Sequence, residues 1–424
     1  MSIRNMRVIV LGAGVIGVTS AYFLARDGND VTVIDRQQGP GMETSFANGG
    51  FVSKLTAKPW AHPSVPKLIL KNFFREDAPY LFRFRADIDQ WIWAARFLSH
   101  CNQKSYAHGR KVCVNLAKYS FSCLEEVRYS ENIEYNKQSN GVLELYKTEE
   151  SLIAASKFAK QLPDPEDHPE ILDMDESKRK EPALTNQSGE YAGTLFYAGE
   201  ETGDARKFTV RLAEIALNLG VKFNYGESIN NVDIKNNNVT GVTTHLKKYS
   251  ADAVVVCLGS YSRELLNKIR IKIPIYPLKG YSVTLPIRNE SSAPIHGIHE
   301  ISRRIVISRL GSRMRCAGTA ELAGFDRSVN MNRTNSILED IQKLFPDLTN
   351  INDAERWAGL RPMSPDCIPI VGLSKINGLL LNTGHGSTGW TWACGSGRII
   401  ADLIKGKEPE LEISPLSPSR FSRS

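Results

Sequence analysis

The chain has 424 residues, of which 42% are hydrophobic and 23% are charged. This composition is typical of soluble globular proteins and excludes disordered, collagen-like and polytopic membrane classes. Because a single hydrophobic core stops growing at roughly 250–300 residues, we expect two domains. The formal net charge of +7 is small for this length, so we expect no nucleic-acid partner.

The cysteines and the N-terminal residues indicate in which cellular compartment the protein is expected. Seven cysteines are scattered along the chain without a C-x-x-C pair or a Cys/His pair at metal-ligand spacing, which predicts reduced core residues and no metal site. Residues 1–7 lead straight into an apolar strand and lack the pattern of a signal peptide. No apolar run reaches the length of a membrane span. We therefore expect a cytoplasmic protein that is at most peripheral on a membrane.

The first motif is a strand, a glycine turn and a helix. Residues 7–11 form a β-branched apolar run, and Gly12, Gly14 and Gly17 follow at once. In this pattern the first glycine permits a tight turn, the second lets the backbone approach a pyrophosphate, and the third lets the helix pack closely on the strand. The N–H groups at the start of the helix then bind the phosphates.

An acidic residue completes this motif. A second apolar run, 31–34, ends on Asp35, eighteen residues after Gly17, where a carboxylate binds ribose hydroxyls. The combination predicts a dinucleotide site but does not distinguish NAD from FAD. The residues expected around the dinucleotide at this end are Val8, Ile9, Val10, Leu11, Gly12, Ala13, Gly14, Val15, Ile16, Gly17, Asp35 and Arg36.

A small, polar loop and a long aromatic and basic stretch come next. Residues 41–53 include Thr44 and Ser45 and have the composition of a loop that touches a ligand. From about 67 to 130 the pattern is helical, and its first part alternates aromatic with basic side chains. We favour amphipathic helices that cover a core, and the alternative is a patch on a membrane surface. The side chains in question are Phe73, Phe74, Tyr80, Phe82, Phe84, Trp91, Trp93 and Phe97, with Lys67, Lys71, Arg75, Arg83, Arg85 and Arg96.

The middle of the chain predicts mixed structure. Strands are expected at 141–147 and 192–197, with a polar connection around 161–182 between them. A helix over 208–219 is expected to end at Gly220, and strands are expected at 221–225, 239–244 and 253–259. The last of these is apolar throughout, as in a strand buried on both faces. Residues 274–286 and 304–319 alternate in polarity, which predicts an antiparallel sheet with one covered face.

The C-terminal part contains a second glycine-rich turn. Residues 378–390 read as an apolar strand that runs into a glycine-rich turn, and a helix then ends near Lys405. Two glycine loops at opposite ends of the chain suit a long ligand, because one can hold its phosphates and the other its reactive ring. This arrangement favours FAD over NAD.

Several segments together resemble a known family. They are the Gly12–Gly17 motif, Asp35, Glu-Thr-Ser-Phe-Ala-Asn at 43–48, Gly203-Asp204, the strand and turn at 254–262, Pro-Leu-Lys-Gly-Tyr-Ser at 277–282, Trp-Ala-Gly-Leu-Arg-Pro at 357–362, and Gly384-His385-Gly386. From about residue 6 to residue 405 the chain is similar to the FAD-dependent D-amino-acid oxidase-like superfamily.

This resemblance implies a fold and a cofactor. The fold is α/β, with a Rossmann-like FAD-binding domain and an inserted α+β substrate domain built on an antiparallel sheet. It implies an FAD-binding domain over 1–70, 199–265 and 345–424 and a substrate domain over 71–198 and 266–344. Further FAD contacts are expected at Thr44, Ser45, Gly259, Gly384, His385, Gly386, Thr388 and Gly389. His385 is expected either to act on the ligand or to hold its turn by hydrogen bonding.

The resemblance also implies an activity. A D-amino acid would be oxidised to the imino acid, which water converts to a 2-oxo acid and ammonia, and the electrons would pass to a quinone or another electron-transfer partner. Peripheral binding to the cytoplasmic face of the inner membrane would suit such an acceptor. One alternative is a related flavin amine oxidase of the glycine, sarcosine or opine type that uses oxygen or another acceptor. Another is a non-catalytic or NAD-binding regulatory protein.

Three residues are the candidate catalytic set. In relatives, the arginine of the Gly-x-Arg-Pro segment pairs with the substrate carboxylate, and here that residue is Arg361. Its planar fork can donate two parallel hydrogen bonds to a carboxylate. Lys279 and Tyr281 lie on the strand expected to cover the substrate side of the flavin, and Tyr281 is either a substrate contact or a half-buried strand residue. No acid–base pair is expected, since the flavin carries the chemistry.

Two segments depart from the family pattern. Residues 54–60, Lys-Leu-Thr-Ala-Lys-Pro-Trp, differ from the usual sequence after the 43–48 loop, and Arg303-Arg304 stands where a Tyr-Lys pair is more usual. Both segments are expected near the substrate. They bear on which amino acid is preferred, which the sequence leaves open along with the oligomeric state.

Overall fold

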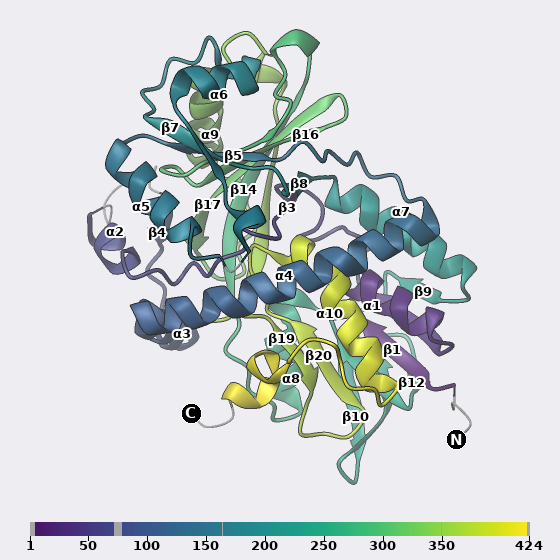
Figure 1. Ribbon diagram of the computed structural model, residues 1–424. Helices are drawn as coiled ribbons and strands as arrows, with labels where there is room; N and C mark the ends of the chain where they lie inside the picture. The colour runs from purple at the N-terminus through teal and green to yellow at the C-terminus, as the bar shows by residue number, and fades with distance from the viewer. Residues whose placement is uncertain (1–4, 72–78, 163, 349, 422–424) are drawn as a thin grey trace.

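The computed structural model describes residues 5–71, 79–162, 164–348 and 350–421. Two large β-sheets form the framework (Figure 1): a six-stranded sheet in the lower half of the view and a nine-stranded sheet in the upper half. The long helix α4 (Gln103–Glu131) runs past both sheets. This mixed α/β architecture confirms the expected fold class.

The six-stranded sheet is nearly all parallel. Its order is β19-β20-β13-β1-β2-β9, and only β19 runs antiparallel to its neighbour. Helix α1 connects β1 to β2, as the glycine motif predicts. The bounds are β1 Arg7–Leu11, α1 Val15–Arg26, β2 Asp30–Asp35, β9 Lys222–Tyr225, β13 Ala253–Val256, β19 Ile370–Leu373 and β20 Leu379–Thr383.

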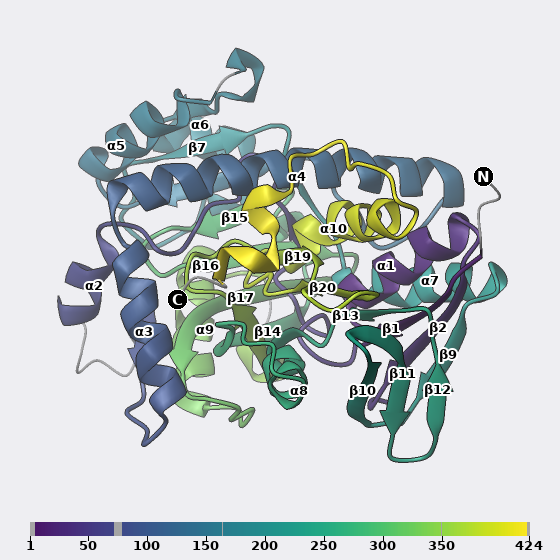
Figure 2. The ribbon, with the colours of Figure 1, turned by 90° about the horizontal axis from the view of Figure 1, so that it is seen from below.

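Both faces of this sheet are covered, which explains its continuous apolar strands. Val8 and Val10 of β1 point into a core with the helices on one face, whereas Ile9 and Leu11 point into a second core on the other face. Figure 2 shows helices α1, α7 and α10 on one side and strands β10–β12 on the other. These elements are α7 Ala205–Asn218, α10 Gly389–Ile404, β10 Ile229–Lys235, β11 Asn238–Thr244 and β12 Lys248–Ser250.

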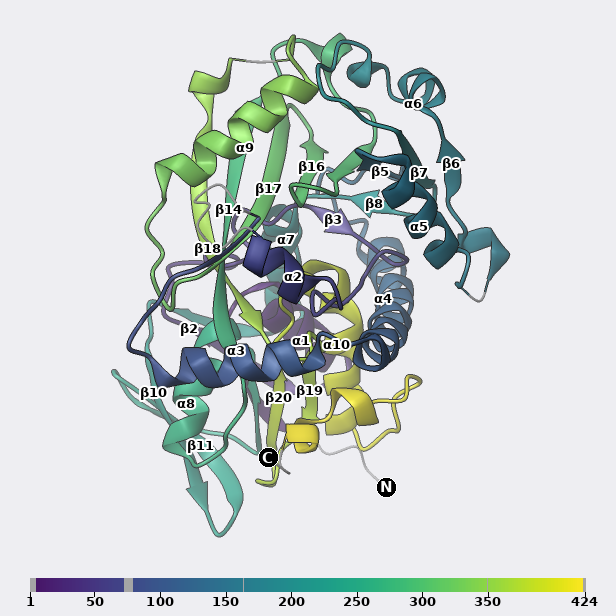
Figure 3. The ribbon, with the colours of Figure 1, turned by 90° about the vertical axis from the view of Figure 1, so that its left-hand side faces the viewer.

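The nine-stranded sheet is mostly antiparallel. Its path is β18-β14-β17-β16-β15-β5-β7-β6, and β4 pairs with β17. Helix α9 (Met331–Leu344) packs across β14 and β17 (Figure 3). The strands are β4 Tyr80–Phe82, β5 Val142–Tyr146, β6 Glu170–Leu172, β7 Gly193–Tyr197, β14 Tyr276–Pro286, β15 Gly297–Glu300, β16 Ile305–Leu310, β17 Arg313–Leu322 and β18 Glu355–Met363.

Some elements differ from the sequence-based expectation. The segment 304–319 forms two strands, β16 and β17, because Gly311 turns the chain with a φ of +66°. The polar connection at 161–182 contains helix α6 (Met174–Lys180). Asp173 and Glu176 cap its N-terminus with reciprocal side-chain-to-backbone hydrogen bonds. Residues 345–424, expected on the cofactor side, contribute β18 to the nine-stranded sheet. The domain boundaries stay a prediction.

The aromatic and basic stretch is helical only in part: helices α2 (Val65–Lys71) and α3 (Ile88–His100) flank strand β4, which contains Tyr80 and Phe82 and pairs with β17, so the expectation of continuous helix was wrong there. Trp93 and Phe97 of α3 are buried, whereas Ile88 and Trp91 of the same helix are exposed. Phe73, Phe74 and Arg75 lie outside the described residues. The other elements nearby are α5 Glu149–Ala159, α8 Ser262–Lys268, β3 Phe51–Val52 and β8 Glu201–Thr202. Within the described part of the chain, no helix combines the length and apolar character needed to cross a membrane.

Candidate functional site

The turn between β1 and α1 requires glycine at two positions. Gly12 has a φ of +103°, and a Cβ there would lie 2.7 Å from the carbonyl oxygen of Cys257. A Cβ on Gly17 would lie 1.8 Å from the carbonyl oxygen of Gly12. At Gly14, in contrast, the nearest atom to a Cβ would be Ser45 Oγ at 3.6 Å. The backbone at Gly14 therefore faces open space, as the phosphate-binding pattern predicts.

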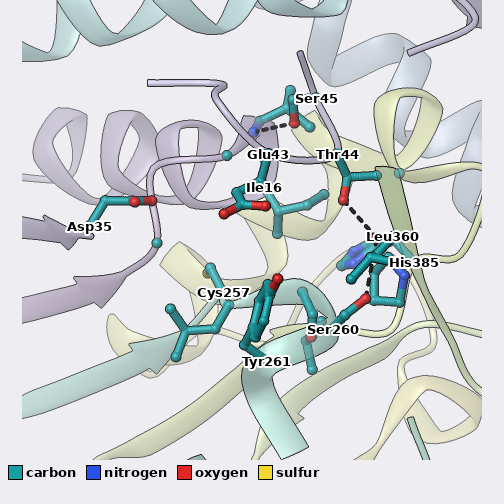
Figure 4. Close-up of a pocket in the computed structure, with 18 of the residues that line it drawn as sticks. Ile16, Asp35, Glu43, Thr44, Ser45, Cys257, Ser260, Tyr261, Leu360 and His385 are labelled. Atoms are coloured by element: carbon teal, nitrogen blue, oxygen red, sulfur yellow. Dashed lines mark hydrogen bonds between the residues drawn. The ribbon is translucent and has the colours of Figure 1, made fainter. Parts of the chain in front are cut away.

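The two glycine segments line one cavity, although they lie at opposite ends of the chain. The cavity has a volume of about 280 Å³ and extends from Asp35 to the turn around His385 (Figure 4). Of the sequence-predicted cofactor residues, those that line it are Gly12, Gly14, Val15, Ile16, Asp35, Arg36, Thr44, Ser45, Gly259, His385, Gly386 and Gly389.

The remaining predicted cofactor residues do not line this first cavity. Val8, Ile9, Val10 and Leu11 are strand residues whose side chains fill the two cores behind the turn. Gly17 packs inside the turn, and Gly384 bends the chain with a φ of +77°. Ala13 contributes its backbone N–H to Asp35, and Thr388 lines a second cavity. Apart from Thr388, these residues support the site and do not face it.

Asp35 sits at one end of the first cavity. Its two carboxylate oxygens accept hydrogen bonds from Ala13 N at 2.6 Å and from Gln37 N at 2.7 Å. Burial raises the pKa of Asp35 despite these hydrogen bonds. Each carboxylate oxygen still has a lone pair for a further donor, such as a ligand hydroxyl.

Loop 43–48 is attached to both sides of the cavity. Ser45 Oγ accepts a hydrogen bond from Val15 N at 3.1 Å, at the start of α1. Thr44 Oγ1 donates to the carbonyl oxygen of Leu360 at 2.7 Å, and Ser260 Oγ donates to the same oxygen at 3.2 Å (Figure 4). Leu360 precedes Arg361 in β18, so these bonds couple the cavity to the strand that carries the candidate substrate ligand.

Two buried polar atoms of cavity residues have no partner. Asn382 Oδ1 and Trp390 Nε1 make no hydrogen bond with any described residue, and both residues line the cavity. Buried polar groups are normally hydrogen-bonded. Together with the open backbone at Gly14 and the carboxylate of Asp35, they fit a long polar ligand such as a dinucleotide.

His385 lies buried in the C-terminal glycine turn. Burial lowers its pKa to about 3, so its imidazole is neutral near pH 7. Its Nε2 lies 3.3 Å from Ser396 Oγ of α10. His385 is therefore suited to hold the turn on the helix and is not suited to carry a positive charge.

A second cavity of about 530 Å³ adjoins the first, and both are lined by Thr44, Asn48 and Gly386. Its charged lining is entirely cationic among the described residues, with Lys58, Arg304 and Arg361 and no Asp or Glu. Glu144, which is buried, pairs with Lys58 at 3.2 Å from behind the lining. The second cavity is therefore built to receive an anion.

Arg361 is held in this cavity by carbonyl groups and an aromatic ring. Its Nη1 donates to the carbonyl oxygen of Thr319 at 2.7 Å, and its Cζ lies 5.3 Å from the centre of the Trp60 ring. No hydrogen bond or ion pair joins it to a carboxylate among the described residues. Burial lowers the pKa of Arg361 to about 10, which leaves the guanidinium charged near pH 7.

Tyr281 is among the residues that line the second cavity and Lys279 is not, and the charged and polar ends of both side chains are bound to carboxylates. Leu278 and Gly280 of β14 lie opposite Arg361 and Gly359 of β18. Alternate residues of a strand point to opposite faces, so Lys279 and Tyr281 point away from Arg361. Lys279 Nζ pairs with Asp326 at 2.8 Å, and Tyr281 Oη donates to Glu321 at 2.5 Å.

Sequence reasoning missed several lining residues. Asn382 lines the first cavity, and Lys58, His62 and Arg304 line the second. Trp390 and Glu43, which also line the first cavity, lie, like Asn382, in segments that the sequence had marked, 378–390 and 43–48. The signal for Lys58 and Arg304 was present, since both fall in the two segments that depart from the family pattern. No sequence signal marked His62, because its cavity contact arises from tertiary packing.

The fold and the first cavity define a class, the α/β proteins that bind a dinucleotide, and a second cavity with a cationic lining adjoins the nucleotide site. The family model described as "FAD dependent oxidoreductase", DAO, matches residues 7–403. The chain belongs to this family. FAD is thus the cofactor that the family implies, and the polar groups and open backbone of the first cavity fit it.

Similar proteins are known over the whole length. The chain is 43% identical over 416 residues to a D-amino acid dehydrogenase of Rhizobium rhizogenes and 44% identical over 416 residues to one of Rhizobium johnstonii; each match covers 98% of this chain and 100% of the relative. The crystal structure of glycine oxidase from Geobacillus kaustophilus has the same fold, with a TM-score of 0.75 at 21% identity over 98% of this chain and 99% of that one.

Proposed function

We propose that this protein is an FAD-dependent D-amino-acid dehydrogenase. It oxidises a D-amino acid to the imino acid with loss of two electrons and two protons. Water then adds to the imino acid and ammonia leaves, which gives the 2-oxo acid. The electrons pass to a quinone-type acceptor. Support comes from relatives named D-amino acid dehydrogenase that are 43% and 44% identical over nearly the whole chain.

The first cavity supplies the residues that would hold FAD. The turn from Gly12 to Gly17 and the N-terminus of α1 would bind the pyrophosphate, and Asp35 would accept hydrogen bonds from the ribose. The turn from Gly384 to Gly389 and the start of α10 would lie at the flavin end. When bound, FAD accepts a hydride from the substrate. Thr388, the N-cap of α10, makes no side-chain capping bond, so backbone N–H groups there can favour negative charge.

The assignment of an amino acid as substrate rests on the guanidinium of Arg361. A guanidinium removed from water is stabilised by a carboxylate partner, and none is present among the described residues. The α-carboxylate of an amino acid would complete this pair through two parallel hydrogen bonds. Arg361 would thereby fix the orientation of the substrate Cα–H.

The cationic lining of the second cavity favours release of the proton from the substrate ammonium group. Hydride loss from Cα requires a neutral amine, whose lone pair becomes the imine bond. Lys58, Arg304 and Arg361 face this cavity, and nearby positive charge disfavours the ammonium form. The lining thus lowers the pKa of the bound amine, so no side chain has to act as a dedicated base.

The surface around α3 supports a peripheral membrane site for the acceptor. Phe84, Ile88, Trp91 and Ile92 are exposed, and Arg85 stands beside them in the chain. Exposed aromatic and aliphatic side chains among basic ones are typical of proteins that bind anionic lipid. We propose that this face contacts the cytoplasmic side of the inner membrane, where a quinone would be available.

The test starts from the purified holoprotein. It is expected to be yellow, and anaerobic D-alanine or D-proline should bleach the flavin band while the L-isomers leave it unchanged. A colourless protein, or bleaching by both isomers, would contradict the proposal.

The acceptor is tested separately. Reduction of a quinone-type dye should far exceed hydrogen peroxide formation in air. A high peroxide yield with glycine or sarcosine would instead indicate an amine oxidase on the same fold.

A further inference from the structure

Arg304 is a second arginine that lines the second cavity, and its charge has no acidic partner among the described residues. It follows β15 in a turn and lines the second cavity with Arg361. Among the described residues, its guanidinium stacks on Tyr80, with Cζ 4.8 Å from the ring centre. The neighbouring Arg303, in contrast, binds Asp340 at 2.7 Å. Arg303 therefore stabilises the fold through an ion pair, whereas Arg304 lines the cavity.

The backbone presents Arg304 in an unusual conformation. Its φ is +56°, a left-handed value that is uncommon for residues other than glycine, asparagine and aspartate. Such conformations persist where the surrounding structure enforces them, and they are frequent at functional sites. A glycine would suit this turn better, and the arginine there places a charge in the cavity.

Arg304 and Arg361 are separated by an aromatic pair. Arg361 lies over Trp60, Arg304 lies over Tyr80, and the two rings meet edge to face at 5.7 Å between centres. The guanidinium groups are thus held apart rather than side by side on one anion. A ligand with an anionic group at each end could contact both.

The space around Arg304 is open and positively charged. Ser64, Ala154 and Ala155 are small residues in this lining. Burial, together with the charges of Arg304 and Lys58, lowers the pKa of the adjacent His62, so its imidazole stays neutral near pH 7. A cationic side chain would meet repulsion here, and a carboxylate would meet an unpaired guanidinium.

We propose that Arg304 is a specificity-determining residue that binds a side-chain carboxylate, so that the preferred substrates are acidic D-amino acids such as D-glutamate. Arg361 binds the α-carboxylate and Arg304 binds the distal one. This inference rests on the proposed function for its substrate, and it names the side-chain class that the proposed function leaves open.

The kinetic test compares D-glutamate with D-glutamine, which has nearly the same shape without the charge. The wild-type enzyme should have the higher kcat/KM with D-glutamate. In Arg304→Gln the ratio of kcat/KM for D-glutamate to kcat/KM for D-glutamine should fall about 10- to 100-fold, the range of a charge-assisted hydrogen bond; a loss common to all substrates would leave this ratio unchanged. Arg304→Lys should recover part of the preference. Arg211→Gln, which removes an exposed charge on the surface of α7, should behave as wild type.

A binding experiment separates this inference from the proposed function. Glutarate and pentanoate have chains of equal length, with two carboxylates and one, and their binding is followed by perturbation of the flavin spectrum. Glutarate should bind about tenfold more tightly or better in wild type, and Arg304→Gln should remove that advantage. If no D-amino acid is oxidised, the proposed function fails, but this titration still decides the role of Arg304.

Three results would overturn the inference. The first is a wild-type enzyme that oxidises D-glutamine as well as D-glutamate. The second is an equal loss of kcat/KM for all substrates in Arg304→Gln and Arg304→Lys, which would place Arg304 on the α-carboxylate or in the fold. The third is equal affinity for glutarate and pentanoate.

Discussion

The two adjoining cavities are built from different parts of the polypeptide. The first is shaped by backbone turns at Gly12–Gly17 and around Gly386, where a side chain would collide or fill the space. The second is shaped by side chains, with Lys58, Arg304 and Arg361 brought from three separate segments. Backbone geometry therefore defines the site for the nucleotide, whereas long charged side chains determine which smaller ligand the second cavity prefers.

The two cavities nevertheless meet on one strand. In β18, the carbonyl oxygen of Leu360 accepts hydrogen bonds from Thr44 and Ser260 beside the first cavity. The next residue, Arg361, lines the second. Changes that move this strand should therefore affect both cavities, whereas changes confined to one wall should affect only one.

The largest expected effect comes from the glycine turn. Gly17→Ala places a Cβ 1.8 Å from the carbonyl oxygen of Gly12, so the free energy of unfolding should fall by about 3 kcal/mol or more. Gly14→Ala should instead fold with nearly unchanged stability and retain flavin poorly, because its Cβ is directed into open cavity. Thermal unfolding and flavin content after gel filtration measure the two effects. Equal stability of both variants would contradict this account of the turn.

Removal of Arg361 tests the second cavity. Arg361→Ala should lower kcat/KM about 100- to 1000-fold, mainly through a higher KM, because a charge pair with the substrate is lost. FAD should remain bound. Arg361→Lys should be intermediate, since it keeps the charge without the planar fork. Loss of flavin from these variants would instead assign Arg361 a structural role.

His385 predicts a pH dependence of stability. Because the folded-state pKa is lowered from 6.5 to about 3, the unfolded chain binds this proton first as the pH falls. The contribution of neutral His385 to stability is therefore complete above pH 6.5 and is lost toward pH 3, by about 1.4 kcal/mol per pH unit. Urea unfolding over this range should show a shallower pH dependence for His385→Gln than for wild type. Identical pH slopes would show that His385 does not resist protonation in the folded protein.

The smallest effect on catalysis is expected at Tyr281. Its hydroxyl donates to Glu321 on the far face of β14, so Tyr281→Phe should change kcat/KM by less than about twofold. Stability should fall by about 1–3 kcal/mol, because the buried carboxylate loses a donor. A large loss of activity at unchanged stability would return Tyr281 to the substrate side.

Much of the fold was predictable because its signals are local. Residues 7–11, the three glycines and Asp35 follow each other within one strand–helix–strand unit, and the structure has that unit in β1, α1 and β2. The apolar run of β13 likewise predicted a strand that is buried on both faces. Gly311 was harder to interpret, since a single glycine inside an alternating segment does not show whether the chain turns there.

The candidate site was predictable where the backbone defines it and less so where side chains do. Arg361 was found through a segment shared with the family, and the structure places it on a cavity wall. Lys279 and Tyr281 were expected on that wall; Tyr281 lines it, and the pairing of β14 with β18 directs both side chains away from Arg361. Arg304 stood out in the sequence only as a departure from a pattern.

The sequence by itself determined the class of fold and the glycine turn of a dinucleotide site, because each depends on residues that are neighbours along the chain. Only the tertiary structure decided which face of β14 each side chain occupies, that residues near both termini line one cavity, and that Arg304 shares a cavity with Arg361. These outcomes depend on the register between strands far apart in sequence, and the spacing within a single segment does not encode that register.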